Sequence, residues 1–145
     1  MIGLIQRVTH ASVTVAGEPV GAIERGLLVL VGVQRDDNEN RADRLLARLL
    51  SYRVFPDSEG RMNRSVTDIE GGLLLVPQFT LAADTRKGTR PGFSTATAPE
   101  VAQHLFHYLH EQACLKHAAV ARGEFGADMD VSLCNQGPVT FWLEA

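Results

Sequence analysis

The alternation of apolar and polar positions predicts strands over the first 33 residues. Apolar side chains fall at every second position through much of residues 2–15, which is the period of a half-buried strand. A hairpin turn is expected at Gly17-Glu18, followed by a strand over 20–24. The run 27–31 is apolar at every position, which is typical of a strand covered on both faces and places it at the centre of the sheet.

Two segments have helical spacing instead. A polar run over 34–40 leads into apolar positions three and four residues apart over 42–50, with arginines on the opposite side. A second helix is expected over about 99–114, because T-A-P-E at 97–100 matches a capping box with a proline in the first turn. The apolar stripes of both helices predict that they pack against a sheet.

The remaining elements settle the expected fold class. Shorter strands are expected over 52–55, 73–76, 131–133 and 139–143, and a turn over 135–138. Strands outnumber helices and the early connections have hairpin length, which favours an α+β fold of mostly antiparallel sheets with two main helices covering one sheet. A length of 145 residues is the usual size of one domain, so residues 1–145 are expected to form a single domain.

Composition narrows the function classes. Fourteen Lys and Arg against 17 Asp and Glu give a net charge of -3, which argues against a broad basic surface for nucleic acid and leaves only a local patch. No apolar run approaches the ~20 residues of a membrane helix, and the amino end lacks a secretory pattern. No membrane contact and a cytoplasmic location are therefore expected. In a reducing compartment Cys114 and Cys134 are expected to be free, buried thiols.

The common catalytic and cofactor motifs do not occur. No phosphate-binding loop or dinucleotide fingerprint is present, and Ser94 lacks the second glycine of a nucleophile elbow. His104, His107 and His110 lie three residues apart on the second predicted helix, which leaves a zinc site as an alternative. Successive three-residue steps turn ligands around a helix, however, so a solvated histidine face and no metal are favoured.

A long loop over 82–96 contains Arg86, Lys87 and Arg90. Long loops in compact domains are often binding elements, and these cations are candidates for contacts with phosphates. Arg7 is a further candidate from the first strand.

Two short segments stand out. Q-F-T-L at 78–81 follows Pro77, which cannot donate a ladder hydrogen bond, so regular pairing is expected to stop, bulge or reach an edge there. If the backbone stays extended, Gln78 and Thr80 share one face, either in a site or simply facing water. The second segment, N-Q-G-P-V-T at 135–140, has the composition of a hairpin turn.

Together these segments resemble the two signatures of the D-aminoacyl-tRNA deacylases, S-Q-F-T-L and N-x-G-P-V-T, in the same order and at about the same separation. The resemblance extends from M-I-G-L-I-Q-R-V at 1–8 to G-P-V-T-F-W-L at 137–143. It implies a homodimer with a layered β/β/α fold, in agreement with the α+β expectation.

The resemblance also implies the reaction. Members of this family hydrolyse the ester that joins a D-amino acid, or glycine mischarged on tRNA(Ala), to the terminal adenosine of tRNA, with assistance from the RNA and without a cofactor or metal. The implied catalytic residues are Gln78, Phe79 through its backbone N–H, and Thr80. The implied substrate-binding residues are Gly137, Pro138, Met129 and Arg7, with a cis Gly-Pro bond that enters the partner's pocket and excludes L side chains.

One position departs from the family pattern. Pro77 stands where the signature has serine, and a related group that acts on L-alanine carries P-Q-A-T-L. Phe79 and the segment 135–140 favour the D-specific group. Two alternatives stay open, namely a deacylase with relaxed chirality owing to Pro77 and a non-catalytic homodimer that binds tRNA.

Overall fold

The computed structural model describes all residues from 1 to 145, and it begins with the three predicted strands. They are β1 (Ile2–Val15), β2 (Glu18–Ile23) and β3 (Gly26–Gly32). The hairpin turn lies at Ala16 and Gly17, with φ angles of 50° and 81°, one residue earlier than expected. This part of the chain therefore follows its apolar pattern.

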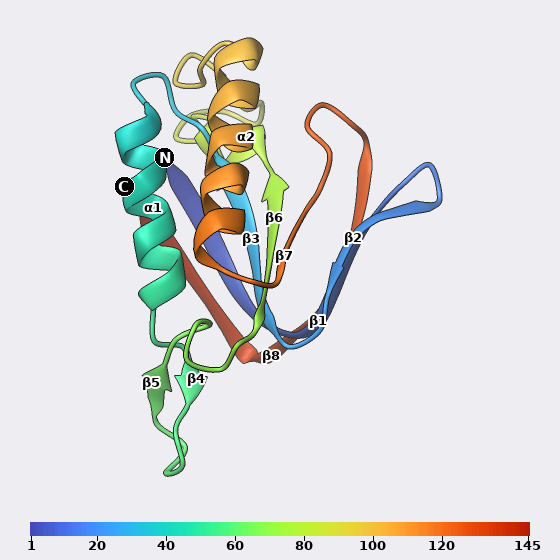
Figure 1. The fold of residues 1–145 in the computed structure, drawn as a ribbon. Coiled ribbons are helices and arrows are strands. Elements are labelled where there is room, and N and C mark those ends of the chain that lie inside the picture. Colours follow the sequence, from blue (N-terminus) through green and yellow to red (C-terminus); the bar gives the residue numbers. More distant parts are fainter.

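One six-stranded sheet organises the molecule (Figure 1). Its order is β2-β1-β3-β6-β7, and β8 pairs with β1. The bounds of the later strands are β6 (Gly72–Pro77), β7 (Val120–Arg122) and β8 (Met129–Glu144). A small hairpin consists of β4 (Phe55–Pro56) and β5 (Met62–Arg64). The α+β expectation is confirmed.

The sheet is mixed, which refines the expectation of mostly antiparallel pairing. β1 is antiparallel to β2, β3 and β8, whereas β3, β6 and β7 are mutually parallel. The sequence prediction missed β7, because three residues are too few to show a period. The parallel pairs follow from the helices, which carry the chain back across the sheet between successive parallel strands.

The expected hairpin turn at 135–138 is wrong. The segments before and after it do not pair with each other; both run antiparallel to β1 as parts of one long strand, β8. The register places Val8 opposite Asn135 and Gln6 opposite Thr140, so the residues between them bulge out of the ladder. The 14-residue length of β1 allows one partner strand to continue past such an interruption.

The two helices lie where their apolar stripes predict. α1 (Glu39–Ser51) begins after Asn38, whose side chain accepts a hydrogen bond from the Arg41 N–H. α2 (Pro99–Lys116) begins with its proline, but the expected capping box is wrong. The residue that precedes the helix is Ala98, which has no capping side chain, because Pro99 already takes the first helical position.

Two apolar clusters lie on opposite faces of the sheet. The larger one packs both helices against the sheet, with Leu46, Leu75 and Phe106 fully buried. The smaller one, which includes Val13 and Leu74, fills the inside of the curled sheet. Figure 1 shows both helices on one side of the sheet, with β1 and β8 starting or ending beside α1 and bending away from the helices toward β2. The layers are therefore a sheet folded over on itself, covered by helices.

The curling brings the two ends of the strand order together. A Cβ built on Gly21 in β2 would lie only 2.5 Å from the Arg122 carbonyl oxygen in β7. The sheet is thus nearly closed, and β8 remains as a strand along its outer edge beside β1.

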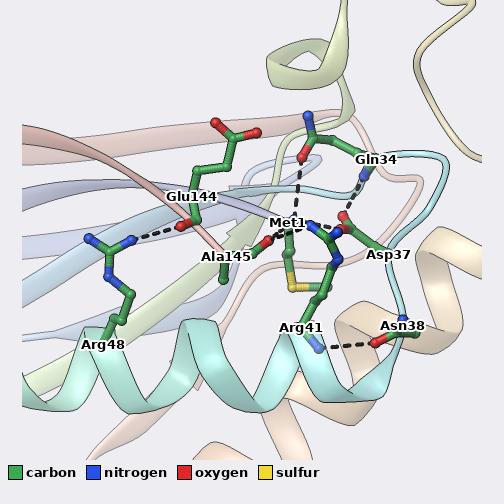
Figure 2. Close-up of polar contacts among 8 residues, drawn as sticks. All are labelled: Met1, Gln34, Asp37, Asn38, Arg41, Arg48, Glu144 and Ala145. Carbon is green, nitrogen blue, oxygen red and sulfur yellow. Dashed lines mark hydrogen bonds and ion pairs between the residues drawn. The ribbon is translucent and has the colours of Figure 1, made fainter.

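Polar contacts fix the ends of β1 and β8 to α1 (Figure 2). The Met1 amino group donates to Asp37 at 2.5 Å and to the Ala145 carbonyl at 2.8 Å. Arg41 and Arg48 of α1 donate to the carbonyls of Ala145 and Glu144. These contacts anchor the carboxyl-terminal end of β8 on α1.

Two further observations concern the helices and the cysteines. Neither helix has the length and apolar character that crossing a membrane requires. Cys114 and Cys134 are free, but the expectation that they are buried is wrong because both are exposed.

Candidate active site

The segment after Pro77 is a tight turn. β6 ends at Pro77, the Gln78 N–H still donates to the Val31 carbonyl at 2.8 Å, and residues 79–82 then form a single turn of 3-10 helix, η1 (Phe79–Ala82). Pairing thus stops at the proline, as predicted. The expected extended backbone at residues 78–81 is wrong, because residues 79–82 form a 3-10 turn.

The turn nevertheless brings the two polar side chains together. Gln78 Nε2 donates to Thr80 Oγ1 at 2.5 Å. An amide group does not accept a proton from a hydroxyl near neutral pH, so this contact orients the Thr80 oxygen without activating it. A 3-10 turn also leaves its first N–H groups without partners inside the helix, and the Phe79 N–H is one of these. The local geometry therefore offers positioned donors and acceptors.

Glycine in β3 allows this turn to approach the sheet. A Cβ on Gly32 would lie 2.8 Å from Leu81 Cβ and 3.5 Å from the Gln78 carbonyl oxygen. Any larger side chain at position 32 would therefore push η1 away from the strand. The position of the turn depends on a residue that no motif marks.

A mostly apolar pocket of about 470 Å³ opens beside the turn. Its lining includes Pro77, Gln78, Phe79 and Met129. This volume lies in the range of small-molecule sites, which are mostly apolar with a few placed polar groups. Two separate parts of the sequence, residues 77–79 and Met129, thus meet at one cavity, and three of these four residues are candidate site residues.

Sequence reasoning missed other parts of this pocket. Phe106 of α2, Phe125 in the segment after β7 and Asp128 also belong to its lining. Gly123 lies beneath it, because a Cβ there would lie 2.7 Å from Met129 Sδ. Helical spacing marked Phe106 as buried, but nothing in the sequence of 123–128 shows that this segment meets Pro77.

The second motif forms an exposed bulge on β8. Asn135 closes it from within: its amide donates to Thr140 Oγ1 at 2.8 Å, and its carbonyl oxygen accepts from the Val139 N–H at 3.1 Å. Gly137 has a φ of 126°, a backbone conformation that favours glycine, and the Gly137–Pro138 peptide bond is cis. The composition of this motif therefore specifies the bulge and its exposed tip.

Arg7 supports this bulge from β1. Its guanidinium donates to the Gln136 carbonyl at 3.2 Å and to the Val54 carbonyl at 2.6 Å. A charged donor on two carbonyls restricts the bulge more than a neutral donor would. Within one chain Arg7 thus belongs with Gly137 and Pro138, away from Gln78.

The two motifs lie in different parts of the molecule. Arg7, beside the bulge, pairs with Leu27 at the start of β3, while Pro77, before the turn, pairs with Val31 near its end. Positions 27 and 31 are four residues apart, which is roughly 13 Å along a strand. Strands β1 and β3 also lie between β8 and β6. The structure therefore brings Gln78, Phe79 and Met129 together at the pocket, whereas Thr80 contacts Gln78 but is not part of the lining. Arg7, Gly137 and Pro138 lie together elsewhere.

The histidines of α2 do not converge. His104 Nε2 lies 3.0 Å from Glu39 Oε1, whereas His110 Nε2 lies 3.5 Å from Cys114 Sγ. No group of three or more histidine, cysteine or acidic side chains is arranged to hold a metal ion. The pocket beside η1 is therefore the strongest candidate site.

Comparisons with known proteins point to one family. The family model described as D-Tyr-tRNA(Tyr) deacylase matches residues 4–144. A D-aminoacyl-tRNA deacylase of Janthinobacterium sp. (strain Marseille) is 65% identical over 144 residues, covering 99% of this chain and 97% of that protein. One from Stutzerimonas stutzeri (strain A1501) is 63% identical over 145 residues, covering all of both.

Two solved structures share the fold. The c-Myc DNA Unwinding Element Binding Protein superposes with a TM-score of 0.95 at 38% identity, covering 100% of this chain and 99% of that chain. A probable eukaryotic D-amino acid tRNA deacylase has a TM-score of 0.88 at 16% identity, covering 99% and 98%, which supports the fold alone.

Proposed function

Because the chain belongs to the D-Tyr-tRNA(Tyr) deacylase family, we propose that it hydrolyses the ester bond between a D-amino acid and the terminal ribose of tRNA. The products are the free D-amino acid and the tRNA. The observation that carries the proposal is the Gln78–Thr80 contact at the rim of a pocket of about 470 Å³. That volume suits an aminoacyl group attached to a nucleoside end.

The proposed chemistry relies on positioning. An aminoacyl ester is already activated, so a water molecule assisted by the neighbouring ribose 2′-hydroxyl can attack it without a protein nucleophile. Gln78 and Thr80 hold the ester, and the Phe79 N–H faces the oxygen on which negative charge develops. Thr80 does not act as the nucleophile, because its partner is an amide donor and no base adjoins it. Ester hydrolysis of this kind needs no cofactor or metal.

The second half of the proposed site comes from a second copy of the chain. Gly137 and Pro138 are exposed and lie far from the pocket of their own chain. Phe141 and Trp142 on the same strand are 37% and 51% exposed, and unpaired edge strands are common pairing surfaces. In a homodimer, each bulge would enter the pocket of the other subunit.

This arrangement accounts for the proposed chirality. A bulge tip close to the α-carbon leaves room for the hydrogen of a D-amino acid but excludes an L side chain, so the L-aminoacyl-tRNAs of normal translation survive. Glycine has no side chain to exclude, so glycyl-tRNA(Ala) is accepted as well. Pro77 supplies no hydroxyl at the family's serine position, and the D-specific geometry then rests on the bulge. We take residues 1–145 as one deacylase domain that acts on tRNA in the cytoplasm.

The direct test is incubation of the purified protein with D-tyrosyl-tRNA and L-tyrosyl-tRNA, each with and without a chelator. We expect rapid release of D-tyrosine, little release of L-tyrosine, and no effect of the chelator. Equal rates for both isomers would indicate relaxed chirality, and tRNA binding without release would indicate a non-catalytic binding protein. Loss of activity in chelator would indicate a metal-dependent hydrolase.

A further inference from the structure

A second hollow, lined only by polar residues and glycine, lies next to the pocket. It has a volume of about 410 Å³ and is lined by loop residues Asp84, Arg86, Lys87, Arg90, Gly92 and Ser94. This loop leaves η1 at one end and returns to the pocket lining at Ala96. The Thr95 hydroxyl donates to the Ala82 carbonyl at 2.5 Å, which closes the base of the loop. The loop that lines the hollow is therefore continuous at both ends with segments that line the pocket.

The cations of this loop are not equivalent. Arg86 donates two hydrogen bonds to the Asp84 carboxylate, at 2.8 and 2.7 Å, and these contacts hold the pKa of Asp84 well below its usual range. Arg86 is therefore held in place and partly neutralised. Lys87 and Arg90 are exposed and form no ion pair. They leave two positive charges for an anion that arrives from solution.

An exposed aromatic pair lies between the hollow and the pocket. The rings of Phe79 and Phe93 have centroids 5.4 Å apart, and their side chains are 62% and 43% exposed. Exposed phenylalanines are unusual, and flat rings beside cations are the arrangement on which single-stranded nucleic acids bind, with bases stacked on rings and phosphates near the cations. A peptide partner would not need both features on one short rim.

We propose that this loop binds the single-stranded 3′ end of the tRNA substrate. The phosphates that precede the terminal adenosine lie against Lys87 and Arg90, and one unpaired base stacks on Phe93, while the aminoacyl ester occupies the pocket. This assignment rests on the proposed deacylase function. It also explains how a chain with a net charge of -3 binds RNA, because the positive charge is concentrated at the mouth of the site.

The test compares two substrates that share the scissile ester. D-tyrosyl-tRNA carries the phosphates and the unpaired bases, whereas D-tyrosyl-adenosine lacks both. For K87A/R90A we expect KM for D-tyrosyl-tRNA to rise about tenfold, and the slope of log(kcat/KM) against log[salt] to become shallower by about 1.4 for two lost contacts. Turnover of D-tyrosyl-adenosine should stay unchanged. Arg44→Ala combined with Lys116→Ala, which removes two exposed helix cations, is the charge-matched control.

Phe93 is tested separately. Phe93→Leu keeps an apolar side chain without a flat ring, and we expect KM for D-tyrosyl-tRNA to rise about fivefold or more, with rescue by Phe93→Trp. The proposal is overturned if K87A/R90A and the control behave alike, or if both substrates are affected equally. Failure of the wild-type protein to hydrolyse either substrate would instead contradict the deacylase function itself.

Discussion

The turn at residues 78–82, which follows the end of β6, and the bulge at residues 135–140, which interrupts β8, are held in opposite ways. The turn follows a buried parallel strand and is fixed by close packing, since Gly32 leaves no space for a Cβ beneath it. The bulge projects from an exposed edge strand and is fixed by polar contacts from Asn135 and Arg7. One region lies beside a pocket and is packed against the sheet from behind, and the other projects from the edge and is held by hydrogen bonds.

This difference indicates how the site is divided. A segment that positions the ester has to be supported from behind, which a buried strand provides. A segment that enters another subunit has to be exposed and still keep its shape, which the bulge achieves with hydrogen bonds inside one strand. On this account neither region is a complete site, and each substitution below affects one region without the other.

The largest expected effect comes from adding one methyl group to the bulge. In Gly137→Ala the new Cβ would lie 2.8 Å from Val139 Cγ2 at a φ of 126°. The tip has to move, and a displacement of about 1 Å in a positioned group can reduce a rate about 100-fold. We expect a loss of that size in single-turnover hydrolysis of D-tyrosyl-tRNA. Gly17→Ala is the control, because it also has a positive φ, of 81°, but nothing lies within 4 Å of its Cβ. Activity of Gly137→Ala within twofold of wild type would show that the bulge is not part of the site.

One methyl group beneath the turn should have the next largest effect. In Gly32→Ala the Cβ would meet Leu81 Cβ at 2.8 Å, which displaces η1. We expect about a tenfold loss of hydrolysis and a stability loss of about 1–3 kcal/mol. Gly3→Ala separates the two effects, since the nearest atom to its Cβ is the end of the Leu45 side chain, at 3.1 Å, and η1 is not among its neighbours. If urea unfolding shows similar destabilisation but both variants keep full activity, the position of the turn does not matter for catalysis.

A smaller effect is expected from the Thr80 hydroxyl. Because Thr80 Oγ1 accepts a hydrogen bond from Gln78 and has no base beside it, Thr80→Ala should keep single-turnover activity within about tenfold of wild type. Thr80→Ser should be close to wild type. Complete loss in Thr80→Ala, with folding and tRNA binding intact, would show that the turn supplies the nucleophile.

The smallest effect lies outside both regions. Burial lowers the pKa of His110, with a further contribution from the charge of Arg122. The neutral ring is therefore favoured in the folded state. The contribution of His110 to the free energy of unfolding is complete above about pH 6.5, and it is lost as the pH falls through the lower folded-state pKa. The ring is only partly buried, so we expect a loss below about 1 kcal/mol between pH 7.5 and 5 in urea unfolding. His110→Gln should reduce this pH dependence without changing hydrolysis at pH 7.5, and an unchanged dependence would assign it to another group.

Much of this architecture follows from local pattern. The strands near the amino end, both helices and the stop at Pro77 are expected from periodicity and from proline, because each depends on residues close in sequence. The same reasoning fails for β7, which is too short to show a period, and for the 135–138 segment, whose composition suits a hairpin turn. Only the length of β1 determines that both halves of β8 pair with it.

The candidate site is predictable to a different degree. The two motifs mark Gln78 and Gly137. The contact between Gln78 and Thr80 forms in a 3-10 turn and not in the extended backbone that the sequence predicts. The contributions of Gly32 and Phe125 depend on long-range packing and have no signal in one sequence. The place of Arg7 beside the bulge required the register of β1 with β8.

The division of the site between two chains is tested most directly by complementation. Chains with Gln78→Ala and chains with Gly137→Ala are co-expressed with different tags, and the heterodimers are purified. If the bulge acts in the other subunit, each heterodimer regains one intact site and about half of wild-type hydrolysis of D-tyrosyl-tRNA. A heterodimer of wild type with the doubly substituted chain should then be inactive. The opposite result would contradict the account: the heterodimer of Gln78→Ala with Gly137→Ala is inactive, and the heterodimer of wild type with the doubly substituted chain keeps half of the activity. Both regions would then belong to a site within one chain.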